Sequence, residues 1–332
     1  MRADAEDRPM LTVLVATYNG AHTLPKSLDA YCQLQAPAGG WKLVIVDNGS
    51  SDETKQIIRS FSDRLPVTYI VEPSRGKSVA LNSGLSRVEG DLAVFTDDDV
   101  LPREDWLIEM RRAADSQPSF SIFGGAIVPH WEVWPADWVL EHVPQAPVFG
   151  ATDPSWAEGP IAPGFVFGAN MGIRVEIFER GHRFNAEIGP RGGNYAMGSE
   201  TELTLRLASA GIKAWHCRRA IVEHIVRRSQ LNQRWILHRA RKLGREQYRL
   251  RIQREQVNNK FLLGVPRWLI KQTLRESLGA GYAKLAGDSA QAFQSRWKFN
   301  YLLGQAIEAR ILHGERKASN PRRLNPNPQS GV

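Results

Sequence analysis

The chain has 332 residues, of which 42% are hydrophobic and 23% are charged. These proportions are typical of a globular protein with a packed core, and they exclude a chain that is disordered throughout. The formal net charge of +8 hides two opposite parts: residues 227–323 hold 22 Lys and Arg against 6 Asp and Glu, so the first 226 residues carry a net charge of −8.

The two cysteines, Cys32 and Cys217, lie far apart and match no metal-ligand spacing, so we expect reduced structural thiols. The opening MRADAEDRPM lacks the apolar segment of a secretion signal, and no stretch approaches the roughly 20 apolar residues of a spanning helix. These features predict a cytoplasmic protein that can meet a membrane only from the side.

Strand-like and helix-like segments alternate through the first hundred residues. Continuous β-branched and apolar runs predict parallel strands that are buried on both faces, and helical spacing predicts helices between them. The expected strands are 11–19, a run from Trp41 to Asp47, 66–72 and 91–99, and the expected helices are 22–35, 53–62 and 78–88. This alternation predicts an α/β fold with a doubly wound, mostly parallel sheet.

The second part of the chain is less regular. We expect a helix at 106–114, a strand at 121–129, a Trp/Pro-rich loop at 130–163, a strand at 165–173, a helix at 174–184, a glycine-rich loop at 189–198, an amphipathic helix at 198–211 and two short strands within 213–226. A basic helical tail follows at about 230–317, with Trp235, Trp268 and Trp297 among its arginines.

Polar groups lie at the carboxyl ends of three of the predicted strands: Thr17-Tyr18-Asn19, Asp47-Asn48 and Asp97-Asp98-Asp99. In doubly wound sheets, ligands bind at the carboxyl ends of the strands, so these groups predict a binding site at one edge of the sheet. Asp97 and Asp99 are suited to hold a divalent cation, since hard cations prefer carboxylate oxygens and share them with substrate phosphates. The alternative for this run is an acidic turn that caps the next helix.

Two further segments fit a nucleotide. Asp47 could accept hydrogen bonds from a base or ribose, or it could be a turn aspartate of the sequence DNGS. Arg75-Gly76-Lys77 precedes a predicted helix, where free backbone N–H groups and the helix dipole favour phosphate. The alternative is a solvated basic turn.

The helix at 198–211 begins with GSETEL. Glu200 on this rigid helix start could serve as the general base that an acceptor hydroxyl needs. Glu202 fits a capping box with Ser199 three residues before it, so we interpret it as mainly structural or as a contributor to acceptor binding. His224 lies in an apolar run typical of a core histidine, yet a metal held by two aspartates has room for its imidazole.

Together these segments resemble family 2 glycosyltransferases, which are inverting enzymes with the GT-A fold. The resemblance covers about residues 10–228 in order: VLVATYNGAHTLPKSL, VDNGSSDET, SRGKSVALNSGL, FTDDDVLP, GFVFGANMGIRVEIF and GPRGGNYAMGSETELTLRLASAG. One departure is that the family's usual Glu-Asp pair reads Ser199-Glu200 here, so the base would be a glutamate without its acidic neighbour.

The resemblance implies a role for each matching position. Its catalytic base is Glu200, and its metal ligands, for Mg²⁺ or Mn²⁺, are Asp97, Asp99 and His224. Its nucleotide-binding residues are Ala16, Tyr18, Asp47, Arg75, Lys77, Asp97 and Asp98, and its acceptor-binding residues are Asn170, Gly198 and Glu202.

These observations predict a metal-dependent enzyme that transfers a sugar from a nucleotide-sugar donor, with a UDP-sugar expected, to a glycan or lipid-linked acceptor in the synthesis of cell-surface polysaccharide or glycolipid. Two rivals stay open: a nucleotidyltransferase that acts on a sugar phosphate, and a non-catalytic glycan-binding protein on the same fold. A nucleic-acid partner is not expected, because the chain has no recognisable reading module.

The expected organisation is a disordered start at 1–9, a catalytic domain at 10–228, a basic helical extension at 229–318 and a disordered end at 319–332. Residues 10–100 form the nucleotide-binding half of the catalytic domain, and residues 101–228 form the acceptor-binding half. The basic extension would either lie on an anionic membrane surface or pack on the catalytic domain.

Overall fold

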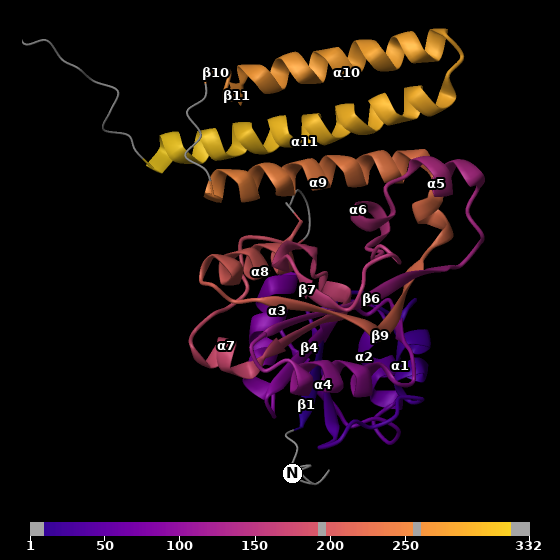
Figure 1. Cartoon of the computed structure of the whole chain (residues 1–332), viewed down its shortest axis with the longest axis vertical. Helices are drawn as coiled ribbons and strands as arrows, with labels where there is room; N and C mark the ends of the chain where they lie inside the picture. Colours follow the sequence, from indigo (N-terminus) through magenta and orange to yellow (C-terminus); the bar gives the residue numbers. More distant parts are fainter. Residues whose placement is uncertain (1–9, 192–196, 255–259, 320–332) are drawn as a thin grey trace, which may run out of the picture. The chain divides into compact units, whose positions relative to one another are not determined.

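The structure is a computed structural model, which describes residues 10–191, 197–254 and 260–319 (Figure 1). The chain divides into two compact units, Met1–Leu231 and Asn232–Val332. The predicted disordered start 1–9, residues 320–332 of the predicted disordered end 319–332, and residues 192–196 of the predicted glycine-rich loop lie outside the described residues.

The first unit begins with the predicted parallel sheet. Its strands β1, β2, β3 and β4 lie in the order β3-β2-β1-β4, and every pair is parallel. Helices α1, α2 and α3 connect them, and a short 3-10 turn at Leu85–Arg87 extends α3. The bounds are β1 Leu11–Thr17, α1 Leu24–Tyr31, β2 Trp41–Asp47, α2 Thr54–Ser60, β3 Val67–Val71, α3 Lys77–Gly84 and β4 Leu92–Thr96. The α/β fold with a doubly wound sheet is therefore confirmed.

The sheet continues through strands of mixed direction in the order β4-β8-β6-β9-β5, with β7 paired to β9. Strand β8 runs antiparallel to both β4 and β6, whereas β6 and β9 are parallel. The bounds are β5 Val100–Pro102, α4 Trp106–Ser116, β6 Ile122–Trp131, α5 Asp137–His142, α6 Gln145–Phe149, β7 Gly159–Ile161, β8 Met171–Arg174, α7 Val175–Glu179, α8 Ser199–Ser209 and β9 Ala214–Val226.

Three expectations for this part are wrong. The predicted strand at 165–173 consists mostly of two 3-10 turns, Pro163–Phe165 and Gly168–Asn170, before the short strand β8. The two short strands expected within 213–226 are one strand, β9. The loop predicted at 130–163 contains α5, α6 and β7, which are too short for a periodic pattern.

Two apolar cores lie on opposite faces of the sheet, as the alternation of side chains along a strand requires. In β1, Val13 and Val15 pack in one core with residues of α1 and α4, including the fully buried Trp106. Leu14 points to the other core, which is closed by residues of α3, α7 and α8. Both faces are thus covered by helices, which explains the continuous apolar runs of the parallel strands.

Strand β9 contains a β-bulge, which sets the register in which its second half pairs with β6. Gly125 of β6 pairs with Cys217, but the next residue of β6 pairs with Ile221, so residues 218–220 bulge from the ladder. The Asn170 side-chain amide donates to the backbone oxygen of Ala220 at 2.8 Å, and to that of Ala126 at 2.9 Å. The amide thereby satisfies a carbonyl group of the bulge.

The second unit contains the predicted basic helices. Its elements are α9 Gln233–Arg254, the hairpin strands β10 Phe261–Leu262 and β11 Val265–Pro266, α10 Arg267–Leu285 and α11 Ser289–Ser319. The backbones of α9 and α11 approach closely at two glycines. A Cβ on Gly244 would lie 1.9 Å from the backbone oxygen of Tyr301, and a Cβ on Gly304 would lie 2.0 Å from the backbone oxygen of Arg241. No helix in the described part of the chain is long and apolar enough to span a membrane.

A buried ion pair also joins α9 and α11. Glu308 is fully buried, and its carboxylate accepts from Arg245 at 2.8 Å and from Arg249 at 2.5 Å. A buried carboxylate with both oxygens paired avoids the cost of an uncompensated charge. Many basic residues of this segment are exposed. Arg245 and Arg249 instead point inward and form ion pairs with Glu308 in the core of the unit.

Gly84 provides a test of the close contact between α3 and the sheet. An added Cβ would lie 2.4 Å from Leu14 Cδ1 and 2.8 Å from Val46 Cγ2. We expect Gly84→Ala to lower the free energy of unfolding by about 1–3 kcal/mol, because this overpacking outweighs the better helix propensity of alanine. Thermal and urea unfolding followed by circular dichroism measure the change.

The matched control is Gly281→Ala in α10, where no heavy atom lies within 4 Å of the added Cβ. This substitution should leave stability unchanged or raise it by up to about 1 kcal/mol. A Gly84→Ala variant that unfolds at the wild-type temperature would contradict the packing of α3 described above.

Candidate active site

Three strand ends meet at one edge of the sheet, as predicted. Thr17 pairs with Asp47 across β1 and β2, and Val15 pairs with Thr96 across β1 and β4. Because these strands are parallel neighbours, the residues that follow them leave the sheet at the same edge. The aspartate run therefore lies beside the ends of β1 and β2, and the remaining site residues reach this edge from β9, α3 and α8.

Asp97, Asp99 and His224 form a cluster whose potential ligand atoms lie within 4.8 Å of one another. His224 reaches the aspartates because β9 runs antiparallel to β5, with His224 opposite Val100, and because the Ile225 N–H donates to the Asp99 backbone oxygen at 2.9 Å. The three side chains are partly buried. Two carboxylate oxygens and an imidazole nitrogen suit a divalent cation that also binds substrate oxygens.

The histidine ring is oriented for this role. Its Nδ1 lies 2.7 Å from the backbone oxygen of Phe149, which accepts only from a protonated Nδ1. This hydrogen bond leaves Nε2 facing Asp99, at 3.2 Å from Oδ1. A metal-ligating histidine is commonly held in this way by a carbonyl group behind it.

The charges in this cluster depend strongly on one another. Burial by itself would lower the pKa of His224, but the Asp99 carboxylate raises it to about 9. Burial would raise the pKa of Asp99, yet His224 and Arg227 hold it below its usual range. Burial and the charge of Asp99 raise the pKa of Asp98 to about 7. Asp99 is thus the carboxylate that pairs with both His224 and Arg227, and these two groups keep it ionised.

Lys77 joins the aspartate cluster to the helix α8. Its Nζ lies 2.5 Å from Asp97 Oδ1 and 2.6 Å from Glu200 Oε1, and all three side chains are largely shielded from solvent. Burial would lower the pKa of Lys77, but the two carboxylates raise it, so the ammonium group stays charged. One buried cation therefore holds together the predicted metal ligand and the predicted base.

Glu200 is held on both of its carboxylate oxygens. Oε1 faces Lys77, and Oε2 accepts from the Ser199 hydroxyl at 2.6 Å. Gly168 makes room for it, since a Cβ there would lie 2.5 Å from the carboxyl carbon of Glu200. Burial would raise the pKa of Glu200, but Lys77 and Ser199 lower it, so the carboxylate is ionised and able to accept a proton.

At the start of α3, the backbone N–H groups of Gly76 and Lys77 donate hydrogen bonds to other parts of the protein. The Gly76 N–H donates to Asn48 Oδ1 at 2.7 Å, and the Lys77 N–H donates to the Pro190 oxygen at 2.7 Å. The N–H groups of Gly76 and Lys77 are therefore not free to bind a phosphate, and phosphate binding at this helix start stays a prediction. The cationic side chains remain at the site, with the Arg75 guanidinium 4.3 Å from the centroid of the Tyr18 ring.

Asp47 shows the turn that DNGS predicts, because its Oδ1 accepts from the Ser50 N–H at 2.8 Å. Its Oδ2 accepts from the Tyr69 hydroxyl at 2.8 Å, and the side chain is buried. Ala16 is half-buried at the end of β1, and Tyr18 is exposed beyond it. Contact of these residues with a nucleoside stays a prediction.

Asp98 points to the end of β1 rather than to the metal cluster. Its carboxylate accepts from the Thr17 hydroxyl, and its backbone oxygen accepts from Ser27 at 3.1 Å. Gly20 allows this approach, since a Cβ there would lie 2.7 Å from Asp98 Oδ2. The middle aspartate thus ties the site loop to β1, and its predicted contact with the nucleotide stays a prediction.

Two interpretations of predicted acceptor residues need correction. Asn170 is fully buried and bonds to Trp106 Nε1 at 2.8 Å in addition to the β9 bulge, so it does not face an acceptor. The capping box is also wrong: Gly198 precedes α8 with a φ of 88°, Ser199 bonds to Glu200, and Glu202 pairs with Arg206 at 2.9 Å. Acceptor contact of Gly198 and Glu202 stays a prediction.

Three further residues contribute to the site, and the sequence did not predict their roles. Ser199, read only as a cap, donates to the candidate base. Gly168 supplies space that only a residue without a Cβ leaves, and its place in FVFGAN carried no signal of this. Arg227 lies 4.0 Å from Asp99 Oδ2, and its position three residues after His224 was the only available hint.

Comparison with known proteins gives consistent matches. Residues 12–181, about half of the chain, match Glycosyl transferase family 2. Glycosyltransferase AglE from Haloferax volcanii is 34% identical over 102 residues, which are 30% of this chain and 33% of AglE. The chain therefore spans about a third of the length of that relative.

Two solved structures have the same fold. The mannosyltransferase PcManGT from Pyrobaculum calidifontis, in complex with GDP-Man and Mn²⁺, superposes with a TM-score of 0.61 at 22% identity, over 92% of this chain and 88% of that one. A segment of TarS from S. aureus, in complex with UDP-GlcNAc, gives a TM-score of 0.52 at 15% identity, over 95% and 93%. The expected GT-A fold is thereby confirmed.

The geometry of the metal cluster leads to a direct test. We expect Mn²⁺ alone to bind the wild-type chain, and Asp99→Asn to weaken its affinity by about tenfold or more, because one of the two carboxylate ligands becomes neutral. Isothermal titration calorimetry or electron paramagnetic resonance of Mn²⁺ measures the affinity.

Asp98→Asn is the matched control, since it makes the same change one residue away in a side chain that bonds to Thr17. It should keep the Mn²⁺ affinity within about threefold. Equal losses in the two variants would mean that the aspartate run attracts Mn²⁺ only through its total charge.

Proposed function

The chain belongs to glycosyltransferase family 2, and we propose that it transfers a sugar from a nucleotide-sugar donor to an acceptor hydroxyl with inversion at the anomeric carbon. The observation that carries this proposal is the pairing of Lys77 with both Asp97 and Glu200. This pairing supports the proposal because it would bring a group that binds the donor diphosphate and a carboxylate base within reach of one substrate. A nucleotidyltransferase would have no use for a buried base at this position.

The donor half of the proposed site consists of the strand-end residues. Asp97, Asp99 and His224 would hold a divalent metal, which stabilises the negative charge of a departing nucleoside diphosphate when it is bound. The ammonium group of Lys77 supplies a permanent positive charge beside these residues, so it can stabilise the phosphates without a proton transfer. Tyr18, Asp47 and Arg75 would contact the nucleoside end of the donor.

The acceptor half depends on Glu200. Its ionised carboxylate would take the proton of the acceptor hydroxyl as that oxygen attacks the anomeric carbon. The Ser199 hydroxyl fixes the orientation of the carboxylate through Oε2, while Lys77 holds Oε1. Binding of the donor diphosphate would draw Lys77 toward the phosphates and leave Oε1 to the acceptor, so the base would become available only once a donor is present.

For the partners, we propose a UDP-sugar donor and a glycan or lipid-linked acceptor in the synthesis of cell-surface polysaccharide or glycolipid. Work at the cytoplasmic face of a membrane, from a peripheral position, is consistent with the basic second unit. A thermal-shift panel of UDP-, GDP- and dTDP-sugars with Mn²⁺ identifies the donor as the compound that raises the melting temperature most.

The role of Glu200 is tested with that donor. Turnover is followed as release of nucleoside diphosphate, with water or an added sugar as acceptor. We expect Glu200→Gln to lower kcat by about 10²–10⁴-fold and to change the donor KM by less than about threefold, because the amide cannot take a proton but leaves the donor half intact.

Glu179→Gln is the control for this substitution, since Glu179 is exposed at the end of α7 and lies outside the site. It should match the wild type. Wild-type turnover in the Glu200→Gln variant would refute the assignment of the base, and release of pyrophosphate from a nucleoside triphosphate would favour the nucleotidyltransferase instead.

The charge of Lys77 should appear in the pH dependence of the reaction. Lys77 lowers the pKa of Glu200, which burial alone would raise. Without the cation, the carboxylate binds its proton at higher pH, so we expect Lys77→Met to move the acid limb of the kcat/KM profile upward by about one pH unit or more.

Arg75→Met removes a neighbouring cation that lies over Tyr18 and has no described contact with Glu200. It should weaken donor binding while the acid limb stays at the wild-type pH. The link between Lys77 and the base would be disproved by an acid limb that stays in place in Lys77→Met.

A further inference from the structure

The exposed side of α10 carries large apolar side chains that no described residue of the second unit covers. Leu274, Leu278, Tyr282 and Leu285 are 61%, 76%, 77% and 90% exposed. Their spacing of four, four and three residues places them in one stripe of a helix with about 3.6 residues per turn. Exposed leucines are common singly, but a continuous stripe of this kind marks an interaction surface.

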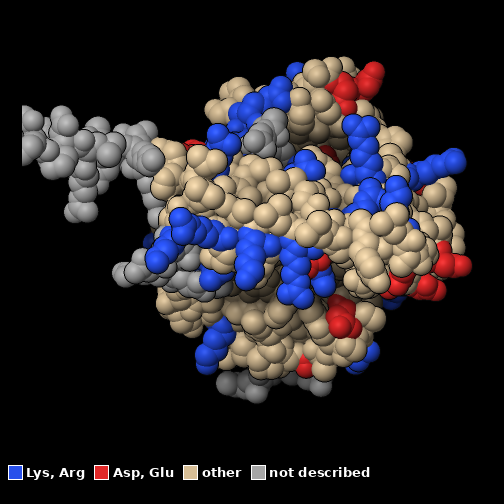
Figure 2. All heavy atoms as spheres, turned by 90° about the horizontal axis from the view of Figure 1, so that it is seen from above, with Lys and Arg blue, Asp and Glu red and all other residues tan. Residues whose placement is uncertain are grey.

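Basic residues share this side of the helix. Arg267, Lys271 and Arg275 are exposed and also follow one another at intervals of four residues. Lys271 and Arg275 each lie three residues before a leucine of the stripe, so the cationic and apolar residues form one face. Figure 2, which looks onto α10 from above, shows Lys and Arg side chains in a row along a ridge of uncharged residues.

The charge of this face has one sign only. The single acidic residue within α10, Glu276, falls on the opposite side of the helix and is half-buried. A surface for a second copy of this basic segment would bring cations against cations, which costs free energy of association. A surface with apolar residues, cations and no carboxylate is complementary to a layer that is negatively charged outside and apolar beneath.

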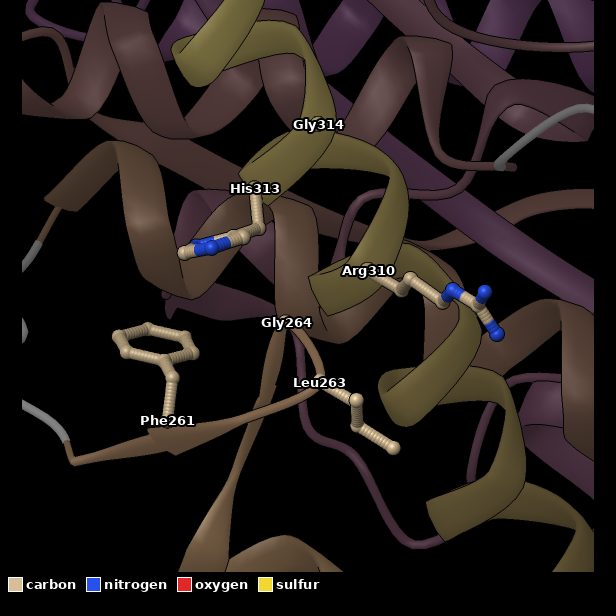
Figure 3. A pocket seen from close by; sticks show the side chains of 6 residues that line it. All are labelled: Phe261, Leu263, Gly264, Arg310, His313 and Gly314. Atoms are coloured by element: carbon tan, nitrogen blue, oxygen red, sulfur yellow. The ribbon is translucent and has the colours of Figure 1, made fainter. Parts of the chain in front are cut away.

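The hairpin that leads into α10 has the same character. Leu262 and Leu263 at its tip are 49% and 85% exposed. Beside the tip is an open hollow against α11, in which the rings of Phe261 and His313 stack at 5.1 Å (Figure 3). Arg310 lines the same hollow and adds an exposed cation next to the apolar tip.

We propose that the α10 face, defined by Arg267, Lys271, Leu274, Arg275, Leu278, Tyr282 and Leu285, is the surface that docks the protein on an anionic lipid bilayer. The leucines and Tyr282 insert at the boundary of head groups and acyl chains, and the three cations bind lipid phosphates. The three tryptophans of the basic segment do not form this surface, because each is only partly exposed. This surface would provide the peripheral membrane contact of the proposed function, and the inference rests on that proposal.

Flotation of the full chain with vesicles tests this surface. We expect binding to phosphatidylcholine vesicles that contain phosphatidylglycerol, and weak binding to phosphatidylcholine alone. Leu278→Glu should weaken binding to the anionic vesicles by more than about tenfold, because it loses an inserted leucine and adds a repelled charge. Gln272→Glu is the matched control, since it adds the same charge at an exposed position off the face and should bind nearly as the wild type does.

The cationic part is tested by the combined substitution of Arg267→Gln, Lys271→Gln and Arg275→Gln. It should lower affinity for the anionic vesicles by on the order of 100-fold, at about fivefold for each residue, and make binding less dependent on salt. Circular dichroism spectra that match the wild type show that the helices of each variant are intact.

Two results would overturn the inference. In the first, the wild-type chain fails to float with anionic vesicles. In the second, Leu278→Glu floats normally but changes the oligomeric state in analytical ultracentrifugation, which would assign the face to a second copy. Turnover of a soluble donor, with its dependence on Glu200, is measured without vesicles, so the loss of one proposal leaves the other standing.

Discussion

The contact on which the site depends is the double ion pair of Lys77. A buried ammonium group would be too costly alone, and so would two buried carboxylates, but together they satisfy one another. Because Asp97 directly follows β4, while Lys77 belongs to α3 and Glu200 to α8, this contact also aligns three elements that lie far apart in the sequence. The same charges keep Glu200 ionised, so the arrangement that stabilises the site also prepares it for proton transfer.

Close backbone approach is the second constraint, and glycine provides it at each crowded point. Gly20 and Gly168 admit the side chains of Asp98 and Glu200, and Gly125 admits the amide of Asn170. In each case a Cβ would overlap the functional or supporting group. The metal ligands and the base are therefore positioned by packing around them as much as by the strands and helices that carry them.

The sequence predicted best where one residue pattern dominates. Continuous apolar runs located the parallel strands, and the strand ends then located Asp47 and Asp97 at one edge, because this step needs only the direction of the strands. The strand expected at 165–173 failed because its apolar residues serve two 3-10 turns. The Lys77–Glu200 contact could not be predicted, since nothing local at either residue reports a partner more than a hundred positions away. Likewise, the capping box was plausible for α8 until the Ser199 hydroxyl was found on Glu200.

The bulge of β9 has a consequence for how this protein can vary. Residues 218–220 separate two stretches of β9 that pair with β6 in different registers, so the stretch Ile221–Val226, which contains His224, is phased independently of the stretch Ala214–Cys217. Side chains alternate along a strand, so gain or loss of one residue within the second stretch would present Glu223 or Ile225 to Asp99 in place of the imidazole. Within β9, a change of length inside 218–220 would therefore keep the direction in which His224 points, whereas a change of length between Ile221 and His224 would alter it.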